Sequence, residues 1–310
     1  MPATFIDLAN RVKQQLLGYT KDQAALSYLM VAMDASDGTF QVDPETVTNL
    51  SRGLVEIDDE LILVKKFDRA SGTVTTLSGT FGRGAEGTTP ADHVVGSLVT
   101  NDPRFPLVRV KEAINDTING VYPDLWVFGE YEFPYNSARY EYPIPAEAEG
   151  VHKVVVNTIG PSGVWFPLTS WRFNALASTT AGQVKPSPAP TGKSIQLMRD
   201  AIVPGRNVRV TYTKKPDVLV GNSDLFEAVS GLPERCVDLI VYGACWRLLP
   251  AYEAARLQQQ AIEATERAPL VLAGAASNAA QLYLSLYTKR LNEERDRLFE
   301  LFENYQNFNS

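Results

Sequence analysis

Hydrophobic residues recur at helical spacing at the start of the chain, and Gly18 suits the left-handed residue that ends many helices. Between residues 26 and 77 the pattern changes to short, strand-like apolar runs, which turn signals such as Asp37-Gly38 and Ser71-Gly72 separate. The chain therefore predicts a short helix followed by a small β module. The apolar positions on one side of that helix are Phe5, Leu8, Val12 and Leu16.

A second helical stripe covers residues 106–119 and stops between Gly120 and Pro123. From Tyr131 to about Val220, β-branched and aromatic runs return with glycine and proline between them, which favours antiparallel strands. The last part of the chain predicts two long helices, the first with a kink at Pro250. Their apolar faces hold Val237, Val241, Ala244 and Leu248 in the first, and Leu284, Tyr287, Leu291, Leu298 and Leu301 in the second.

These elements predict an α+β fold. Residues 1–100 are expected to form the N-terminal helix plus the small β module. Residues 101–130 and 225–310 are expected to form a helical bundle with two long C-terminal helices, and residues 131–224 an inserted antiparallel β domain. A length of 310 residues is compatible with two or three such units.

Composition excludes several classes of protein. The formal charge of −7 argues against a nucleic-acid-binding protein, although a basic patch inside a lumen remains compatible with it. Cys236 and Cys245 lie nine residues apart in one predicted helix, so they point to different parts of the surface and are too far apart to bridge. With only His93 and His152 as imidazoles, a Cys/His zinc site is not expected. No apolar run predicts a membrane helix or a signal peptide.

Two glycine motifs invite a nucleotide-binding interpretation, and neither has the required surroundings. Gly82-x-Gly84-x-x-Gly87 formally matches the dinucleotide fingerprint, but Pro90 and Gly96 follow where a long apolar helix should stand. Residues 191–194 match the end of a P-loop, but Ser187 replaces its first glycine. We therefore expect no cofactor.

Catalytic residues are not apparent either. Asp58-Asp59-Glu60 falls at a hairpin turn, and a solvated turn is the simplest interpretation of these three acids. His93 is expected to hold its loop through a hydrogen bond from the imidazole to a backbone carbonyl. No nucleophile elbow, zinc-binding helix or Cys/His dyad occurs. The sequence therefore predicts a protein that is not an enzyme.

Other residues are candidates for packing or subunit contacts. Trp246, beside Leu248 and Leu249, is expected to anchor the bundle. The charged run 289–298 fits either a solvated helix face or a seam between subunits. Residues 179–191 and the tail 302–310 are expected to be mobile until a neighbouring ring orders them. The aromatic residues of that tail are Phe302, Tyr305 and Phe308.

Four short blocks resemble proteins of the tailed-phage neck. Residues 82–96, with Arg83, Thr88, Thr89 and His93 as loop candidates, resemble a loop common in phage neck and tail proteins. Residues 50–64 resemble the strand pair that precedes this loop in actinobacteriophage head-to-tail connectors. The helix block 104–126 and the block from Gly231 to Leu249 are similar to segments of phage adaptor proteins. The four blocks together resemble a head-to-tail connector or adaptor.

The resemblance implies a structural virion protein made in the host cytoplasm and located at the head–tail junction. Its implied partners are further copies of itself in a ring of roughly twelve, the portal protein, the next neck or tail protein, and DNA that passes without sequence-specific contacts. No membrane partner is implied. A tail tube, tail terminator or baseplate protein is the main alternative, and a carbohydrate-binding tail appendage is a remote one.

Overall fold

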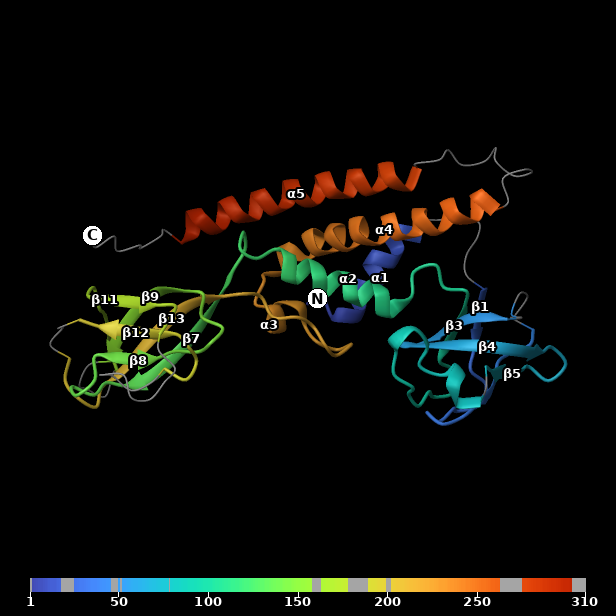
Figure 1. The fold of residues 1–310 in the computed structure, drawn as a ribbon, viewed down its shortest axis with the longest axis horizontal. Coiled ribbons are helices and arrows are strands. Elements are labelled where there is room, and N and C mark those ends of the chain that lie inside the picture. Colours follow the sequence, from blue (N-terminus) through green and yellow to red (C-terminus); the bar gives the residue numbers. More distant parts are fainter. Residues whose placement is uncertain are drawn as a thin grey trace.

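The computed structural model shows a helical bundle flanked at its two ends by two separate β units (Figure 1). Antiparallel sheets and helices are both present, which confirms the α+β class. Three separate clusters of buried apolar residues form the cores of the bundle and of the two β units. The structure describes residues 2–17, 25–45, 50, 52–77, 79–157, 163–177, 189–198, 202–262 and 275–302.

The first β unit is a small antiparallel barrel. Its strands follow the order β1-β6-β3-β4-β5-β2, and a bridge between Leu29 and Val42 joins the two outermost strands. The Met30 amide donates to the Gln41 carbonyl at 2.9 Å beside that bridge, so the sheet closes on itself and leaves few free edge groups. The strands are β1 (Ala25–Tyr28), β2 (Thr39–Gln41), β3 (Gly53–Ile57), β4 (Glu60–Asp68), β5 (Thr73–Thr76) and β6 (Leu98–Asn101). Two 3-10 turns, η1 (Gly79–Gly82) and η2 (Ala85–Gly87), lie between β5 and β6.

The bundle contains α1 (Phe5–Leu17), α2 (Leu107–Gly120), α4 (Val237–Ile262) and α5 (Ala275–Leu301), with the short α3 (Phe226–Ser230) and the 3-10 turn η3 (Glu234–Cys236) before α4. α4 continues as one helix through Pro250. α5 lies along α4 (Figure 1). None of the described helices is long and apolar enough to cross a membrane.

The N-terminal helix belongs to the bundle core. The apolar face of α1, with Phe5, Leu8 and Val12, packs with α2 and α4 and not with the barrel interior. The expected unit 1–100 groups this helix with the β module, whereas in the structure the helix packs in the bundle core and the strands of that region form a core of their own. Sequence order suggested the grouping, but an apolar helix face packs on the largest complementary apolar surface, which here is that of α2 and α4.

α2, α4 and α5 meet at a glycine. A Cβ atom on Gly243 would lie 2.2 Å from Thr117 Cγ2 of α2 and 3.0 Å from Tyr287 Cδ2 of α5. Thr117 is fully buried, and its hydroxyl donates to the Ala113 carbonyl at 2.7 Å. The absence of a side chain at residue 243 therefore permits the close approach of these helices.

The second β unit is a sandwich between α2 and α3, as the inserted strand region predicts. One sheet has the order β10-β9-β13-β7 and the other β11-β12-β8. Its core lies between them and takes Val208 and Val210 from one sheet and Tyr142 and Ile195 from the other. The strands are β7 (Val127–Pro134), β8 (Glu141–Pro143), β9 (Gly150–Asn157), β10 (Trp165–Pro167), β11 (Trp171–Asn174), β12 (Ser194–Leu197) and β13 (Asn207–Lys214).

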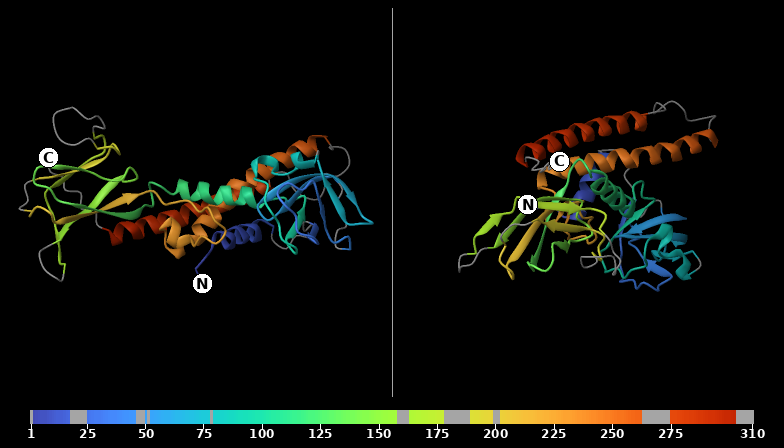
Figure 2. Two further views of the ribbon diagram at one scale, coloured as in Figure 1. Left: turned by 90° about the horizontal axis from the view of Figure 1, so that it is seen from below. Right: turned by 60° about the vertical axis from the view of Figure 1, so that its left-hand side comes forward.

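The domain division into 1–100, 101–130 with 225–310, and 131–224 stays a prediction. Seen from a second direction, the barrel and the sandwich still lie at opposite ends of the bundle (Figure 2). The barrel and the sandwich therefore form two different ends of the molecule.

Candidate functional site

A network of charged side chains closes one end of the barrel. Arg83 forms a two-point ion pair with Glu60, with Nε 2.7 Å from Oε1 and Nη2 2.8 Å from Oε2. Both side chains are fully buried. The guanidinium also donates to the carbonyls of Asp34, Asp37 and Ala91 at 2.7 to 3.0 Å. Arg83 therefore joins the loop between β1 and β2 to the segment between η2 and β6 through one side chain.

His93 extends this network to the turn between β3 and β4. Its Nε2 lies 2.9 Å from Glu60 Oε2, and its Nδ1 lies 2.8 Å from Asp58 Oδ2. The imidazole therefore faces two carboxylates at once, and only its protonated form can donate to both. We refer to Asp58, Glu60, Arg83 and His93 as the ion cluster.

Two expectations about these residues are wrong. Glu60 is not part of a solvated turn, because it is 1% exposed and follows the inward alternation of Ile62 and Val64 on β4. His93 is held by two carboxylates and not by a single backbone carbonyl on its ring. Buried charges are stable only when paired and hydrogen-bonded, and here Glu60 accepts from Arg83, His93 and the amides of Gly84 and Ala91.

The other loop candidates divide into structural and exposed residues. Thr88 Oγ1 accepts from the Leu61 amide at 3.1 Å and donates to the Ala85 carbonyl at 2.8 Å, so it ties the loop to β4. Thr89 is exposed. Gly84 and Glu86 both have positive φ, 62° and 54°, which accounts for the tight path of the chain after Arg83. The loop is thus a structural element of the barrel, with no nucleotide-binding helix following it.

The ion cluster makes barrel stability depend on pH. Burial would raise the pKa of Glu60, but hydrogen bonds from Arg83, His93, Ala91 and Gly84 outweigh it and lower the pKa from 4.5 to about 2. Burial would lower the pKa of His93, but Glu60 and Asp58 raise it above 6.5. The stability that ionised Glu60 contributes to the barrel is fully present above pH 4.5 and is lost as pH falls towards 2. The stability that protonated His93 contributes to the barrel is fully present below pH 6.5 and is lost as pH rises through the elevated pKa of His93.

We therefore expect the barrel to be most resistant to opening between about pH 4.5 and 6.5. Hydrogen exchange of peptides from residues 52–77, corrected for the intrinsic pH dependence of exchange, measures this local opening. In His93→Gln the loss of protection above pH 6.5 should disappear, whereas the loss at low pH should remain. The same alkaline slope in wild type and His93→Gln would contradict the assignment to His93.

Trp246 is only partly buried against the bundle core, so it contributes to the bundle without being its central anchor. Its ring lies 4.8 Å from the Arg247 guanidinium, and its buried Nε1 has no hydrogen-bond partner among the described residues.

The cysteines are free, and both are buried in the bundle core rather than at the surface, which raises each pKa to about 12. Among the residues that the structure covers, no cluster of His, Cys, Asp and Glu has a metal-binding arrangement.

The charged run 289–298 contains one buried carboxylate. Glu294 is 2% exposed and accepts from Arg235 at 2.6 Å, Arg290 at 3.3 Å and Arg297 at 3.5 Å. Because Arg235 lies in η3, this group ties α5 to the start of α4. The expectation of a fully solvated helix face is therefore wrong at Glu294. The other charged residues of this run include exposed ones, and their role in a seam between subunits stays a prediction.

The end of α5 packs on residues around the start of the sandwich. Phe302 lies 4.7 Å from the ring of Phe128 and 5.9 Å from that of His152, and Phe299 lies 5.3 Å from Trp126. The expectation that Phe302 waits for a neighbouring ring is therefore wrong, because edge-on aromatic contacts already hold it within the chain. Tyr305, Phe308 and most of the predicted loop 179–191 lie outside the described residues.

Formal charge is distributed unevenly along the chain. Residues 25–102 contain twelve acidic and five basic residues, so the barrel region carries −7, as much as the whole chain. Residues 127–220 contain seven acidic and ten basic residues, which leaves +3 on the sandwich region. The two ends of the molecule therefore differ in the sign of their charge.

The SU10 adaptor protein family matches residues 93–299, which include α2, α4, α5 and the whole sandwich. The matched part is more than half of the chain. The chain belongs to this family. The adaptor is accordingly a structural phage protein and a virion component, and its family is not a class of enzymes.

The family match begins at His93, so strands β1 to β5 of the barrel lie outside the matched region. No curated protein matches the adaptor. The ion cluster, the contacts at the end of α5 and the difference in charge between the two ends are features of this chain's own structure and sequence. Glu60 could have been found from its inward position in the alternation of β4, whereas the ion pair between Glu294 and Arg235 joins residues 59 apart in sequence and leaves no local pattern.

Proposed function

We propose that the adaptor forms a closed ring of identical copies at the head–tail junction, between the portal and the next neck or tail component. The family match across the bundle and the sandwich carries this proposal. Two unlike ends support it, because a contact between different surfaces of identical chains closes into a ring when the rotation between copies permits. Roughly twelve copies are expected if the ring follows portal symmetry.

The charge of the adaptor fits a passage for DNA better than a DNA-binding surface. A formal charge of −7 per copy gives no net attraction to phosphate groups, on which DNA affinity depends. A ring of such copies would surround DNA without reading its sequence. We propose this contact as a passive one.

Other virion roles have less support. A tail tube, terminator or baseplate protein would be dominated by strands, whereas α4 and α5 form the longest elements here. A carbohydrate site would combine aromatic residues with paired carboxylates. The described hollow lined by Glu147, Glu149 and Asp217 has no aromatic lining residue, and the one beside Leu176 has no carboxylate.

Averaged electron micrographs of the neck in intact virions test the proposal. We expect density for a closed ring of this chain between the portal and the next component. One or two copies per virion, or placement of the chain in a tail fibre, would overturn the proposal. A monomer in dilute solution would not, because docking on the portal can bring the copies together.

A further inference from the structure

Four apolar side chains are exposed together at the end of the barrel. Two backbone bridges join the segments that carry them: the amides of Leu29 and Met33 donate to the carbonyls of Ser97 and His93, each at 2.9 Å. Between these bridges the side chains point to solvent and not to the barrel core. They are Met30 and Val31, each 53% exposed, Val94, 72% exposed, and Val95, 61% exposed. We refer to these four residues as the barrel-end patch.

The ion cluster holds this patch in place. His93 immediately precedes Val94, and its ring is fixed between two buried or half-buried carboxylates. Ser97 follows the turn and donates to Asp58 at 3.2 Å. Gly96, with a φ of 85°, supplies the positive φ of the turn between them. Two exposed valines on a turn fixed at both sides lose little conformational freedom when a partner covers them.

Carboxylates surround the patch. Asp34 follows the bridge at Met33 and is exposed, Asp58 lies behind the turn with 53% of its side chain exposed, and Asp92 precedes His93 and is exposed. The barrel-end patch is therefore apolar at its centre and negative at its rim. Its partner should expose apolar groups beside a positive charge.

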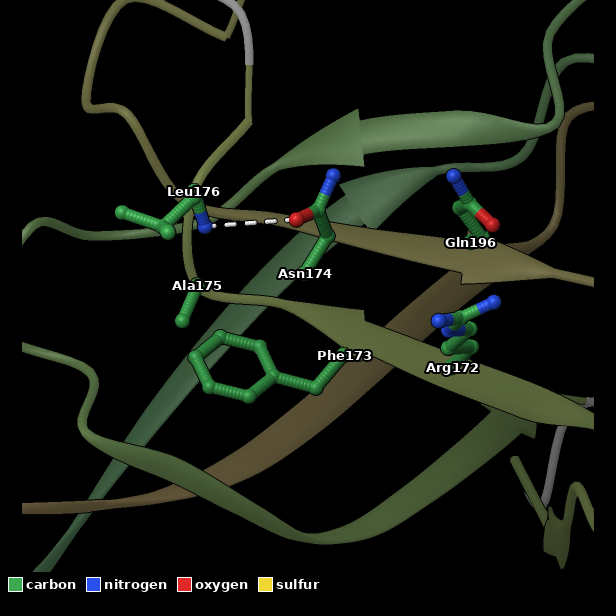
Figure 3. Close-up of a pocket in the computed structure, with 6 residues that line it drawn as sticks. All are labelled: Arg172, Phe173, Asn174, Ala175, Leu176 and Gln196. Atoms are coloured by element: carbon green, nitrogen blue, oxygen red, sulfur yellow. Dashed lines mark hydrogen bonds between the residues drawn. The ribbon is translucent and has the colours of Figure 1, made fainter. Parts of the chain in front are cut away.

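The opposite end of the same molecule has a surface of that kind. A hollow on the sandwich is lined by Arg172, Phe173, Asn174, Ala175, Leu176 and Gln196 (Figure 3). Leu176 is 92% exposed, and the Asn174 side chain holds its amide at 3.2 Å in the turn after β11. Arg172 is exposed and has no ion-pair partner among the described residues. We refer to this surface as the Leu176 hollow.

We propose that the barrel-end patch of one adaptor docks on the Leu176 hollow of the next copy, with Arg172 facing the carboxylates around the patch. This inference rests on the proposed ring and names the contact that forms it. The two surfaces are unlike and complementary in charge, and they belong to the barrel and the sandwich, which lie at opposite ends of the molecule. A head-to-tail contact between identical copies joins two unlike surfaces of this kind.

Cysteine cross-linking in assembled necks tests the contact. Val95→Cys combined with Leu176→Cys should give a ladder of linked chains after oxidation, ending at the copy number of the ring. Each single substitution should give no ladder. The native thiols do not interfere, because Cys236 and Cys245 are buried. A matched control pairs Val95→Cys with Val220→Cys, since Val220 is 82% exposed but lies between the sandwich and α3.

Assembled necks without a ladder, or an equal ladder from the control pair, would overturn the docking proposal and leave the ring intact. Necks without any multi-copy ring in micrographs would instead overturn the proposed function. The two failures are therefore distinguishable in one set of preparations.

Charge reversal provides a second measurement that needs no cysteine. Arg172→Glu should lower incorporation into necks by about tenfold, because it places a carboxylate opposite carboxylates. Adding Asp34→Arg in the same chain should restore most of the loss, and Arg139→Glu, which reverses another exposed charge of the sandwich, should leave incorporation unchanged. Wild-type incorporation of Arg172→Glu, or no restoration by Asp34→Arg, would contradict the contact.

Discussion

Replacing Arg83 with methionine is expected to lower the free energy of unfolding of the barrel by about 3 to 5 kcal/mol. The substitution leaves Glu60 buried without its main partner and removes the donors to three loop carbonyls. Because the Glu60 side chain is 0% exposed, water cannot replace the guanidinium as a partner of its carboxylate. Hydrogen exchange in β3 and β4 under native conditions measures the change.

A matched control is Arg109→Met. Arg109 pairs with Glu112 at 2.8 Å, but both side chains are about half exposed, so the expected cost is below about 1 kcal/mol. If Arg83→Met and Arg109→Met gave equal losses of protection, the buried pair would not be a main determinant of barrel stability. Exchange in α4 should stay unchanged in both variants, because the bundle has its own core.

Replacing Gly243 with alanine is expected to destabilise the bundle by about 1 to 3 kcal/mol, although alanine is the better helix former. The new Cβ would lie 2.2 Å from Thr117 Cγ2, so α2 and α4 would have to separate. Chemical denaturation followed by helical circular dichroism measures the effect.

Thr117→Ser in the same chain should recover most of this loss. Serine removes the Cγ2 atom but retains the hydroxyl that donates to Ala113 and accepts from Arg247. An additive effect of the two substitutions would show that the clash between residues 117 and 243 is not the cause.

Much of the secondary structure follows from local pattern. Residues 5–16, 106–119 and the C-terminal region have helical apolar spacing, and α1, α2, α4 and α5 form there. The strand-rich regions on either side of α2 likewise form the barrel and the sandwich. Such patterns can be read from sequence because a helix or strand buries one face with a fixed period.

The candidate site was predictable only in part. Arg83, Thr88 and His93 were identifiable as important loop residues, but their partners were not, because Glu60 lies more than twenty residues from Arg83 in the chain. The acidic turn Asp58-Asp59-Glu60 has an ordinary turn composition. Only closure of the barrel places Glu60 inside it, where its charge needs Arg83 and His93.

The sequence by itself determined the α+β class, the order of the units and the resemblance to phage adaptors, because periodicity and short motifs are local properties. Tertiary structure decided that α1 packs in the bundle, that Phe302 packs on Phe128, and that Glu294 is buried among arginines. It also decided that Val94 and Val95 lie beside Met30 and Val31 on one exposed surface. These contacts join residues distant in sequence, and their energies depend on burial and distance, which only the folded chain defines.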